Sequence, residues 1–370
     1  MTSEEGTLSD AVGQLKTTGE QSVSCSLITI DRNKILGFGA YGVVFEGTWN
    51  EKKVAVKRIQ IATSESNKQE EEALQKLDHP NIVKLFHVQI DADFRFYALE
   101  LCQASLNHLF LKENDPNKYR GPMPSKKEVL LQLSTGLAHI HEKGLIHRDL
   151  KPGNVLICHD QVDSTGDKVL MKWADFGLSK PVNENGSCSM SELNRGTGNW
   201  YAPEILTMKK EEEDNKYGKK DDKKEKKDKK EKKDKEKSVD KDGKKEKKEK
   251  KEKKDKKKDE ENNTSEDVVD SDIGATASTP RLRGTIKSDV YTEGLIFGYY
   301  LLGGIHPYGS SFEIAQNILD EKPANLKEIK KGQPIIHDIL MEMLKRNPNE
   351  RISSSDVVTK ITNINIKTTA

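Results

Sequence analysis

The fold of this chain is decided by the stretch His147-Arg148-Asp149-Leu150-Lys151-Pro152-Gly153-Asn154, which is followed downstream by Asp175-Phe176-Gly177. The first run contains a proton-accepting carboxylate and a lysine, and it ends on Asn154. Asn154 and Asp175 offer side-chain oxygen atoms, which are the ligands that Mg²⁺ prefers. This spacing predicts that the four groups meet on two neighbouring loops, the arrangement that transfer of a phosphoryl group from ATP requires.

A glycine-rich run lies upstream, Leu36-Gly37-Phe38-Gly39-Ala40-Tyr41-Gly42-Val43-Val44. Glycines let the backbone approach phosphates closely, because no Cβ stands in the way. A similar triplet occurs in dinucleotide-binding folds, but there it opens a helix. Here the chain continues as one strand and then forms a second, Val54-Ala55-Val56-Lys57. We therefore expect a nucleotide beneath a hairpin, in contact with Leu36, Gly37, Gly39, Gly42, Val44, Ala55 and Lys57.

Side chains alternate along the second strand, so Ala55 and Lys57 share one face while the two valines share the other. On the face toward the nucleotide, the small Ala55 suits a lid over the adenine and Lys57 suits a phosphate-binding cation. The two valines on the other face suit a core. An acidic helical run, residues 69–77, follows and ends just before Asp78-His79-Pro80-Asn81. It offers three consecutive glutamates, 70–72, as ionic partners for Lys57.

These motifs together resemble a protein kinase catalytic domain, and Lys151 favours the Ser/Thr type over tyrosine kinases. The similarity covers residues 27–207 and resumes at 283–361. Within this superfamily the chain is most similar to the kinase half of the unfolded-protein-response sensor, the inositol-requiring kinase/endoribonuclease. The pieces that carry this likeness are Val54–Ile59, the hinge Ala98-Leu99-Glu100-Leu101-Cys102, the run Ser134–His141 and the run Gly196–Glu204.

The resemblance implies an α+β, bilobal protein kinase fold, with a small, mostly β N-lobe that has one key helix and a larger, mostly α C-lobe. It implies that the hinge residues Leu99, Glu100 and Cys102 contact the adenine, and that Leu156 floors its pocket. Counted back from Pro80 as in kinases, the partner of Lys57 is Glu70; Glu71 or Glu72 takes that place if the helix register slips.

The same resemblance implies a role for each charged group. The Lys57–Glu70 pair grips the α- and β-phosphates, while Asn154 and Asp175 hold Mg²⁺. Asp149 orients the acceptor hydroxyl and takes its proton. Lys151 neutralises charge on the transferring phosphoryl group. Thr197 contacts Asp149 and Lys151 and favours Ser/Thr acceptors. By resemblance, Arg351 also pairs with Glu204, which ties the activation segment to the lobe.

Regulation is expected in the activation loop, between Asp175 and Glu204. Arg148 precedes the catalytic aspartate, and an arginine in this position is typically neutralised by a phosphate on the loop. The loop contains Ser179 and the cluster Ser187-Cys188-Ser189-Met190-Ser191. We therefore expect autophosphorylation at Ser187, Ser189 or Ser191. The alternative is that these serines only make a polar, flexible loop.

The net charge of +1 hides a charged segment between the two parts of the kinase similarity. Residues 209–260 hold 27 of the 62 basic residues and 19 of the 61 acidic ones, so this segment carries about +8 and the remainder about −7. It has almost no apolar residue with which to bury surface, and we expect it to be disordered. Three roles stay open: a low-complexity expansion, a docking or nuclear-import segment, or a tail that binds nucleic acid.

The expected organisation is a disordered tail (1–26), the first part of the kinase domain (27–207), a disordered Lys/Glu/Asp-rich insert (208–282), the rest of the C-lobe (283–365) and a short tail (366–370). The N-lobe spans 27–101 and the C-lobe starts at 102–207. We expect no membrane span, since no run of 18 or more apolar residues exists. The lumenal, transmembrane and nuclease parts of the sensor family are not expected either.

The four scattered cysteines favour reduced thiols and therefore a cytoplasmic or nuclear location. The expected partners are ATP and a protein substrate, and the family resemblance implies a homodimer. Two other functions stay open: a pseudokinase-like scaffold, and a nucleic-acid-associated protein acting through the insert. The second is disfavoured, because interleaved acids cancel much of the positive field and no aromatics offer base stacking.

Overall fold

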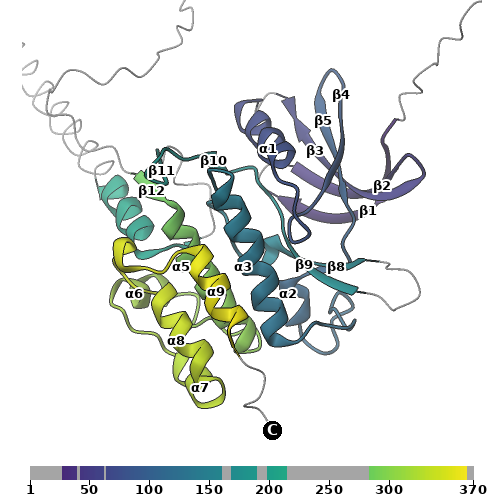
Figure 1. Cartoon of the computed structure of the whole chain (residues 1–370). Helices are drawn as coiled ribbons and strands as arrows, with labels where there is room; N and C mark the ends of the chain where they lie inside the picture. The colour runs from purple at the N-terminus through teal and green to yellow at the C-terminus, as the bar shows by residue number, and fades with distance from the viewer. Residues whose placement is uncertain are drawn as a thin grey trace, which may run out of the picture.

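The chain forms two lobes joined at one side (Figure 1). The computed structural model describes residues 27–39, 42–61, 64–160, 168–189, 198–214 and 283–364. The smaller lobe is mostly β-sheet with one helix, and the larger lobe is mostly helical. The α+β, bilobal fold predicted from the sequence is therefore confirmed.

The small lobe is built on an antiparallel five-stranded sheet in the order β1-β2-β3-β5-β4. Asn50 and Glu51 connect β2 to β3 with φ values of 47° and 61°, the left-handed conformation that two-residue hairpin turns favour. At Gly42, an added Cβ would lie 2.1 Å from the carbonyl oxygen of Arg58, so the close approach of β2 to β3 requires glycine there. The strands are β1 (Thr29–Gly39), β2 (Gly42–Trp49), β3 (Lys52–Gln60), β4 (Leu85–Ile90) and β5 (Phe94–Glu100).

Helix α1 (Ser64–Lys76) lies against this sheet (Figure 1). The buried apolar residues of this helix are Ala73 and Leu74. Leu77, just after the end of the helix, is buried as well. Glu70 is equally buried, at 2% exposure, although it carries a carboxyl group. A charge in that position needs a partner, and Lys57 of β3 provides one.

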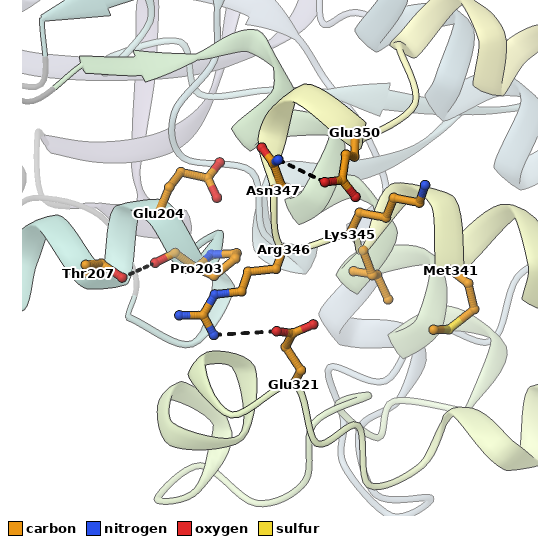
Figure 2. A pocket seen from close by; sticks show the side chains of 10 residues that line it. Pro203, Glu204, Thr207, Glu321, Met341, Lys345, Arg346, Asn347 and Glu350 are labelled. Atoms are coloured by element: carbon orange, nitrogen blue, oxygen red, sulfur yellow. Dashed lines mark hydrogen bonds and ion pairs between the residues drawn. The ribbon is translucent and has the colours of Figure 1, made fainter.

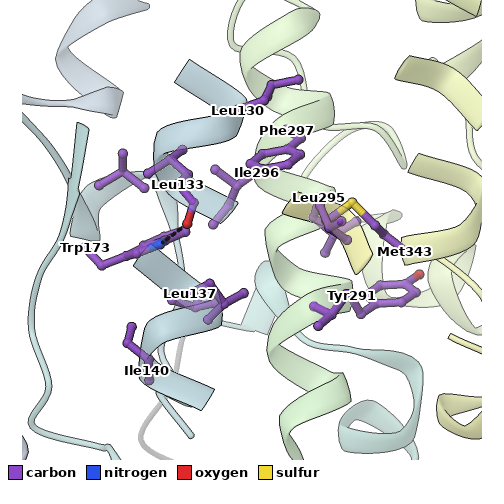
Figure 3. Packing of buried hydrophobic residues seen from close by; sticks show 14 of the residues in the cluster. Leu130, Leu133, Leu137, Ile140, Trp173, Tyr291, Leu295, Ile296, Phe297 and Met343 are labelled. Carbon is purple, nitrogen blue, oxygen red and sulfur yellow. Dashed lines mark hydrogen bonds between the residues drawn. The ribbon is translucent and has the colours of Figure 1, made fainter. Parts of the chain in front are cut away.

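The large lobe is organised around the contact between α3 (Lys126–Glu142) and the more C-terminal helices (Figure 3). Leu130, Leu133 and Leu137 belong to one apolar cluster with Leu295 and Ile296 of α5 (Ile286–Leu301). The remaining helices are α2 (Leu106–Leu109), α6 (Ile314–Leu319), α7 (Leu326–Gly332), α8 (Pro334–Met343) and α9 (Ser354–Thr362).

Short strands connect this helical core to the space between the lobes. Strand β8 (Val155–Asp160) pairs with both β6 (Ala104–Ser105) and β9 (Lys168–Trp173). The indole N–H of Trp173 donates to the carbonyl oxygen of Leu133, 2.9 Å away, and so fixes the end of β9 on α3 (Figure 3). Two further ribbons are formed by β7 (Leu145–Ile146) with β10 (Lys180–Pro181), and by β11 (Ser187–Ser189) with β12 (Arg283–Thr285).

The charged insert begins in a helix. Residues 203–214 are helical, so regular structure continues seven residues past the predicted boundary at 207. Lys209 explains part of this extension: its ammonium group lies 4.1 Å from the ring centroid of Tyr201 and donates to the hydroxyl of that residue at 3.0 Å. The rest of the predicted insert, and the tails 1–26 and 366–370, lie outside the described residues. Among the residues described, no helix has the length and apolar character needed to cross a membrane.

Glu293 of α5 carries a carboxyl group that is buried in the core of the large lobe. Its side chain is fully buried, and neither carboxyl oxygen has a hydrogen-bond partner among the described residues. Burial, and then the nearby Asp289, raises the pKa of Glu293 well above its ordinary value. The native state therefore keeps a proton that the unfolded chain loses, and wild-type stability falls as pH rises above the ordinary pKa of glutamate.

We expect Glu293→Leu to stabilise the protein by about 1–3 kcal/mol near pH 7, because an unpartnered buried carboxyl is removed. The melting-temperature advantage of Glu293→Gln over wild type should grow from pH 5 to pH 8. Glu72→Gln, at an exposed position on α1, serves as the control and should show no such trend. A pH-independent loss of stability in Glu293→Gln would contradict this account.

Candidate active site between the lobes

A cavity of about 300 Å³ lies between the lobes. All the residues predicted to bind the nucleotide line it, as do the predicted metal ligands: Leu36, Gly37, Gly39, Gly42, Val44, Ala55, Lys57, Leu99, Glu100, Cys102, Leu156, Asn154 and Asp175. This volume is at the lower end of the range typical of small-molecule sites. The structure thus brings together, in one cavity, residues that the sequence spreads over more than a hundred positions.

Three charged side chains meet at one end of this cavity. The Nζ atom of Lys57 lies 2.6 Å and 2.8 Å from the two carboxyl oxygens of Glu70 and 2.8 Å from Oδ1 of Asp175. The choice among the three glutamates is therefore resolved in favour of Glu70, whereas Glu71 pairs with Arg95 at 2.7 Å. Strand β3, helix α1 and the segment after β9 each contribute one member of this ionic cluster.

The pKa values in this cluster follow from burial and charge. Burial favours the neutral form of Lys57, but the carboxylates of Asp175 and Glu70 outweigh it, so the pKa of Lys57 is raised and the residue stays charged. Burial also raises the pKa of Glu70, against the attraction of Lys57. For Asp175 the balance is reversed, because burial is outweighed by Lys57 and the pKa is lowered. Lys57 and Asp175 are therefore both ionised.

A second polar group lies on the neighbouring loop. The carboxylate of Asp149 accepts hydrogen bonds at its Oδ2 atom from Lys151 Nζ, at 2.6 Å, and from Asn154 Nδ2, at 3.2 Å. Asn154 Nδ2 also donates to the backbone oxygen of Asp149 at 2.8 Å. These bonds turn the amide nitrogen of Asn154 toward Asp149. The Oδ1 atom of Asn154 then remains available as a ligand or a hydrogen-bond acceptor.

The loop His147–Asn154, called the catalytic loop by family resemblance, is held in place by Asp289 of α5, a residue that belongs to no sequence motif. This buried carboxylate accepts the backbone N–H of His147 at 2.7 Å and that of Arg148 at 3.0 Å. His141 Nε2 lies 3.2 Å from the same carboxylate. Arg148 has a φ of 71°, an unfavourable conformation for a bulky side chain, so the loop depends on such bonds to keep its shape. An aspartate at the start of an apolar helix was the only signal in the sequence.

Asp175 is held in the left-handed region as well, with a φ of 66°. Behind it, the ring of His147 lies 4.8 Å from the ring of Phe176, and its Nε2 atom lies 3.2 Å from the backbone oxygen of Ala174. Burial lowers the pKa of His147, more than the neighbouring carboxylates raise it. The neutral imidazole therefore packs between the two loops and keeps them together.

Further residues line the cavity that the sequence did not single out. Val83 belongs to the segment that joins α1 to β4, and His108 lies on α2. The backbone N–H of Ser105 donates to His108 Nδ1 at 3.0 Å. Neither residue belongs to a motif, so nothing in the sequence pointed to it. The full set of additional lining residues is Phe38, Val83, Leu101, Gln103, Ala104, Ser105, His108, Gly153 and Ala174.

The activation segment is only partly described. Ser187 and Ser189 lie on β11, opposite Thr285 and Arg283 of β12, respectively. Ser189 is exposed, whereas Ser187 is half-buried and its hydroxyl donates to Asn183 Oδ1 at 3.1 Å. Ser179, in contrast, is buried. Thr197 and Ser191, which the sequence predicted to act in catalysis and regulation, lie outside the described residues.

The end of the activation segment is anchored by an ion pair. Arg351 is buried, and its guanidinium group donates to both carboxyl oxygens of Glu204, at 2.8 Å and 3.0 Å. A second hollow, of about 570 Å³, lies beside Glu204 (Figure 2). Within it Arg346 pairs with Glu321 at 3.7 Å and Asn347 donates to Glu350 at 3.0 Å, and none of the predicted catalytic, nucleotide-binding or metal-binding residues lines it. The cavity between the lobes is therefore the better candidate for the active site.

Comparisons with known proteins agree with this geometry. The sequence pattern of the family described as "Protein kinase domain" matches residues 30–223, just over half of the 370 residues. The human "Serine/threonine-protein kinase/endoribonuclease IRE2" is 30% identical over 345 residues, which are 92% of this chain and 29% of that protein.

Two other relatives belong to the same group. The "Sensor for unfolded proteins in the ER ire1" of Schizosaccharomyces pombe is 25% identical over 340 residues, 89% of this chain and 26% of that protein. "Serine/threonine-protein kinase/endoribonuclease ire-1" of Caenorhabditis elegans is 27% identical over 331 residues, 88% of this chain and 26% of that protein. The chain thus spans less than a third of the length of these curated relatives.

The role of Asp289 can be tested through stability. Asp289→Asn removes the charge and leaves one carbonyl oxygen for two backbone N–H groups, so one charged hydrogen bond is lost and the other becomes neutral; we expect a loss of about 2–4 kcal/mol in the free energy of unfolding. Burial raises the pKa of Asp289, but the hydrogen bond and charge of His141, with the bonds from His147, outweigh it and lower the pKa. This stabilisation is therefore present above the ordinary pKa of aspartate and is lost as pH falls through the native value.

Chemical denaturation at several pH values measures this effect. The stability difference between wild type and Asp289→Asn should be largest at neutral pH and should shrink under acid conditions. Asp338→Asn, whose side chain is 76% exposed, is the matched control and should stay close to wild type. Equal stability of Asp289→Asn and wild type at neutral pH would contradict an anchoring role.

Proposed function

Because this chain belongs to the protein kinase domain family, we propose that it is an ATP-dependent protein serine/threonine kinase. It would transfer the γ-phosphoryl group of ATP to serine or threonine hydroxyls of a protein substrate. One observation carries the proposal: the buried Lys57–Glu70–Asp175 cluster shares a cavity with Asn154, whose amide is bonded to Asp149. Phosphoryl transfer depends mainly on positioning and on electrostatic stabilisation, and these groups supply both.

At the nucleotide end, Lys57 would bind the α- and β-phosphates. Its pKa is raised, so it carries a full positive charge at any physiological pH, and Glu70 fixes its direction. The backbone of the glycine-rich hairpin would cover the phosphates, while Leu99 to Cys102 and Leu156 would enclose the adenine from opposite sides. These roles rest on the lining of the cavity and on the family resemblance.

The donor set also fits a divalent metal ion. Asp175 is ionised, and Asn154 presents its Oδ1 oxygen because its nitrogen is engaged by Asp149. Two oxygen ligands beside a phosphate site suit Mg²⁺, which usually takes only one or two ligands from the protein. When bound, Mg²⁺ would neutralise charge on the phosphate oxygens.

At the acceptor end, Asp149 would orient the substrate hydroxyl and accept its proton. The hydrogen bonds from Lys151 and Asn154 fix the direction of its carboxylate before any substrate arrives. Lys151 would also stabilise negative charge on the transferring phosphoryl group, and Thr197 would contact both residues. The scaffold alternative is less well supported, because the charged groups of a working site are intact and the cavity is open.

We also propose that the protein works in the cytoplasm or nucleus and forms a homodimer. The location is supported by the free thiols of Cys102, Cys158 and Cys188. The dimer rests on family resemblance alone, and the mass of the purified protein in solution tests it. The ribonuclease and the sensing of unfolded proteins are named for relatives of which this chain covers 29% and 26%.

The first experiment is Mg²⁺-dependent transfer of phosphate from ATP by the purified chain. Asp175→Ala and Lys57→Met should each lower activity by about 10²–10³-fold or more, because each removes a preorganised charge from the phosphates. Lys53→Met makes the same change at an exposed position on the same strand and should remain active. Binding of ATP without transfer by the wild-type protein would favour the scaffold function.

The regulatory proposal is autophosphorylation of the activation loop. Replacing Ser187, Ser189 and Ser191 together with alanine should lower turnover by about tenfold or more, because Arg148 then lacks a phosphate partner. Phosphosite mapping by mass spectrometry should find modification at one or more of these serines in wild type. Ser311→Ala, at an exposed site on the large lobe, controls for loss of a serine, and unchanged turnover in the triple variant would exclude this regulation.

A further inference from the structure

A second ion pair, with a buried lysine, lies at the junction of the lobes beside the cavity. Glu100 is the last residue of β5, and its Oε2 atom lies 3.0 Å from Nζ of Lys172 on β9. The same oxygen accepts the backbone N–H of Lys84 at 3.2 Å, while Oε1 accepts the thiol of Cys158, on β8, at 3.4 Å. Two strands of the large lobe therefore hold the end of the small lobe's sheet.

Because Lys172 is buried, its ammonium group needs the carboxylate of Glu100 as a partner. Its side chain is only 6% exposed, and Glu100 is the acidic group within ion-pair distance of it among the residues described. A buried ammonium group without a carboxylate partner is strongly unfavourable. Glu100, at 23% exposure, is in turn drawn away from solvent toward the large lobe.

The pair connects two parts of the active site that are far apart in sequence. Glu100 belongs to the hinge, and residues 99–103 all line the cavity. Lys172 lies three positions before Asp175, on the strand that leads to it, but does not line the cavity itself. The backbone supports the same link, since the N–H of Val83 donates to the oxygen of Trp173 and the N–H of Glu100 donates to the oxygen of Lys84, each at 2.9 Å.

We propose that Lys172 is a positioning residue for the nucleotide: by holding the carboxylate of Glu100, it sets the place of the hinge relative to Asp175. The inference rests on the proposed function, because it concerns where ATP is held. Without Lys172, the carboxylate of Glu100 loses its counter-charge and turns toward water, and the hinge backbone moves with it. The two ends of the cavity are then no longer placed for the adenine and the phosphates of one bound ATP molecule.

Lys172→Met tests this proposal, since methionine keeps much of the length of the side chain and removes its charge. We expect the KM for ATP and the directly measured Kd for ATP to rise about tenfold, with kcat changed by less than about threefold. Lys172→Arg, which keeps the charge, should restore most of the affinity. Lys168→Met makes the same change at an exposed position on the same strand and should match wild type.

A double variant separates positioning from general stability. Lys172→Met with Glu100→Gln removes both charges, so its melting temperature should return toward that of wild type, while ATP affinity stays weak. This variant also carries the test if Lys172→Met alone does not fold. Recovery of both properties in the double variant, or an unchanged KM and Kd in Lys172→Met, would overturn the proposal. Failure of wild type itself to bind ATP would instead overturn the proposed function.

Discussion

The active site depends on a lysine that must be buried and must stay charged. Lys57 is 7% exposed, and an ammonium group in that environment is tolerated only with carboxylates in contact. Glu70 and Asp175 meet this need from different directions, one on a helix of the small lobe and one on a loop of the large lobe. The ion cluster therefore requires β3, α1 and the Asp175 loop to come together, and it links the lobes across the cavity.

The large lobe supplies the rigid base for this arrangement. Helix α5 is buried along most of its length, and its Asp289 holds the backbone of the catalytic loop. Both Arg148 and Asp175 have positive φ values, so the two loops are kept in conformations that their own residues do not favour. That strain is maintained by the packing of His147 and by the bonds to Asp289. Because α5 is firmly packed, its Asp289 can hold the backbone of the loop at His147 and Arg148 in a fixed conformation.

The lobes meet at two ion pairs, each with a buried lysine. Lys57 with Asp175 joins them inside the cavity, and Lys172 with Glu100 joins them at the end of β5. One member of each pair comes from the same short segment, since Lys172 and Asp175 are three residues apart. The end of β9 and the loop after it therefore receive contacts from both ends of the cavity. The insert, in contrast, begins at the edge of the large lobe, in the helix that starts at Pro203.

Much of the site was readable from the sequence. The family resemblance drawn from the motifs is confirmed by the match to the protein kinase domain family and by the curated relatives. Alternation along β3 predicted that Ala55 and Lys57 face the ligand, and both line the cavity. These residues could be found because each belongs to a short run in which residue type and spacing are both characteristic. A short run can adopt only a few backbone geometries, so the positions of its side chains follow from the sequence.

Other features depended on the tertiary structure. Asp289 lies 142 residues from the N–H group of His147 that it binds, and Lys172 lies 72 residues from Glu100, so no local pattern indicated either contact. Val83 and His108 are ordinary residues that line the cavity only because their elements fold against it. The sequence by itself determined the fold and the groups available for chemistry, because periodicity and motif spacing are local. The Lys57–Glu70 and Arg351–Glu204 pairs were expected from the resemblance, but the contacts of Asp289 and Lys172 were decided by folding, because a charge removed from water takes its partner from whichever element packs against it.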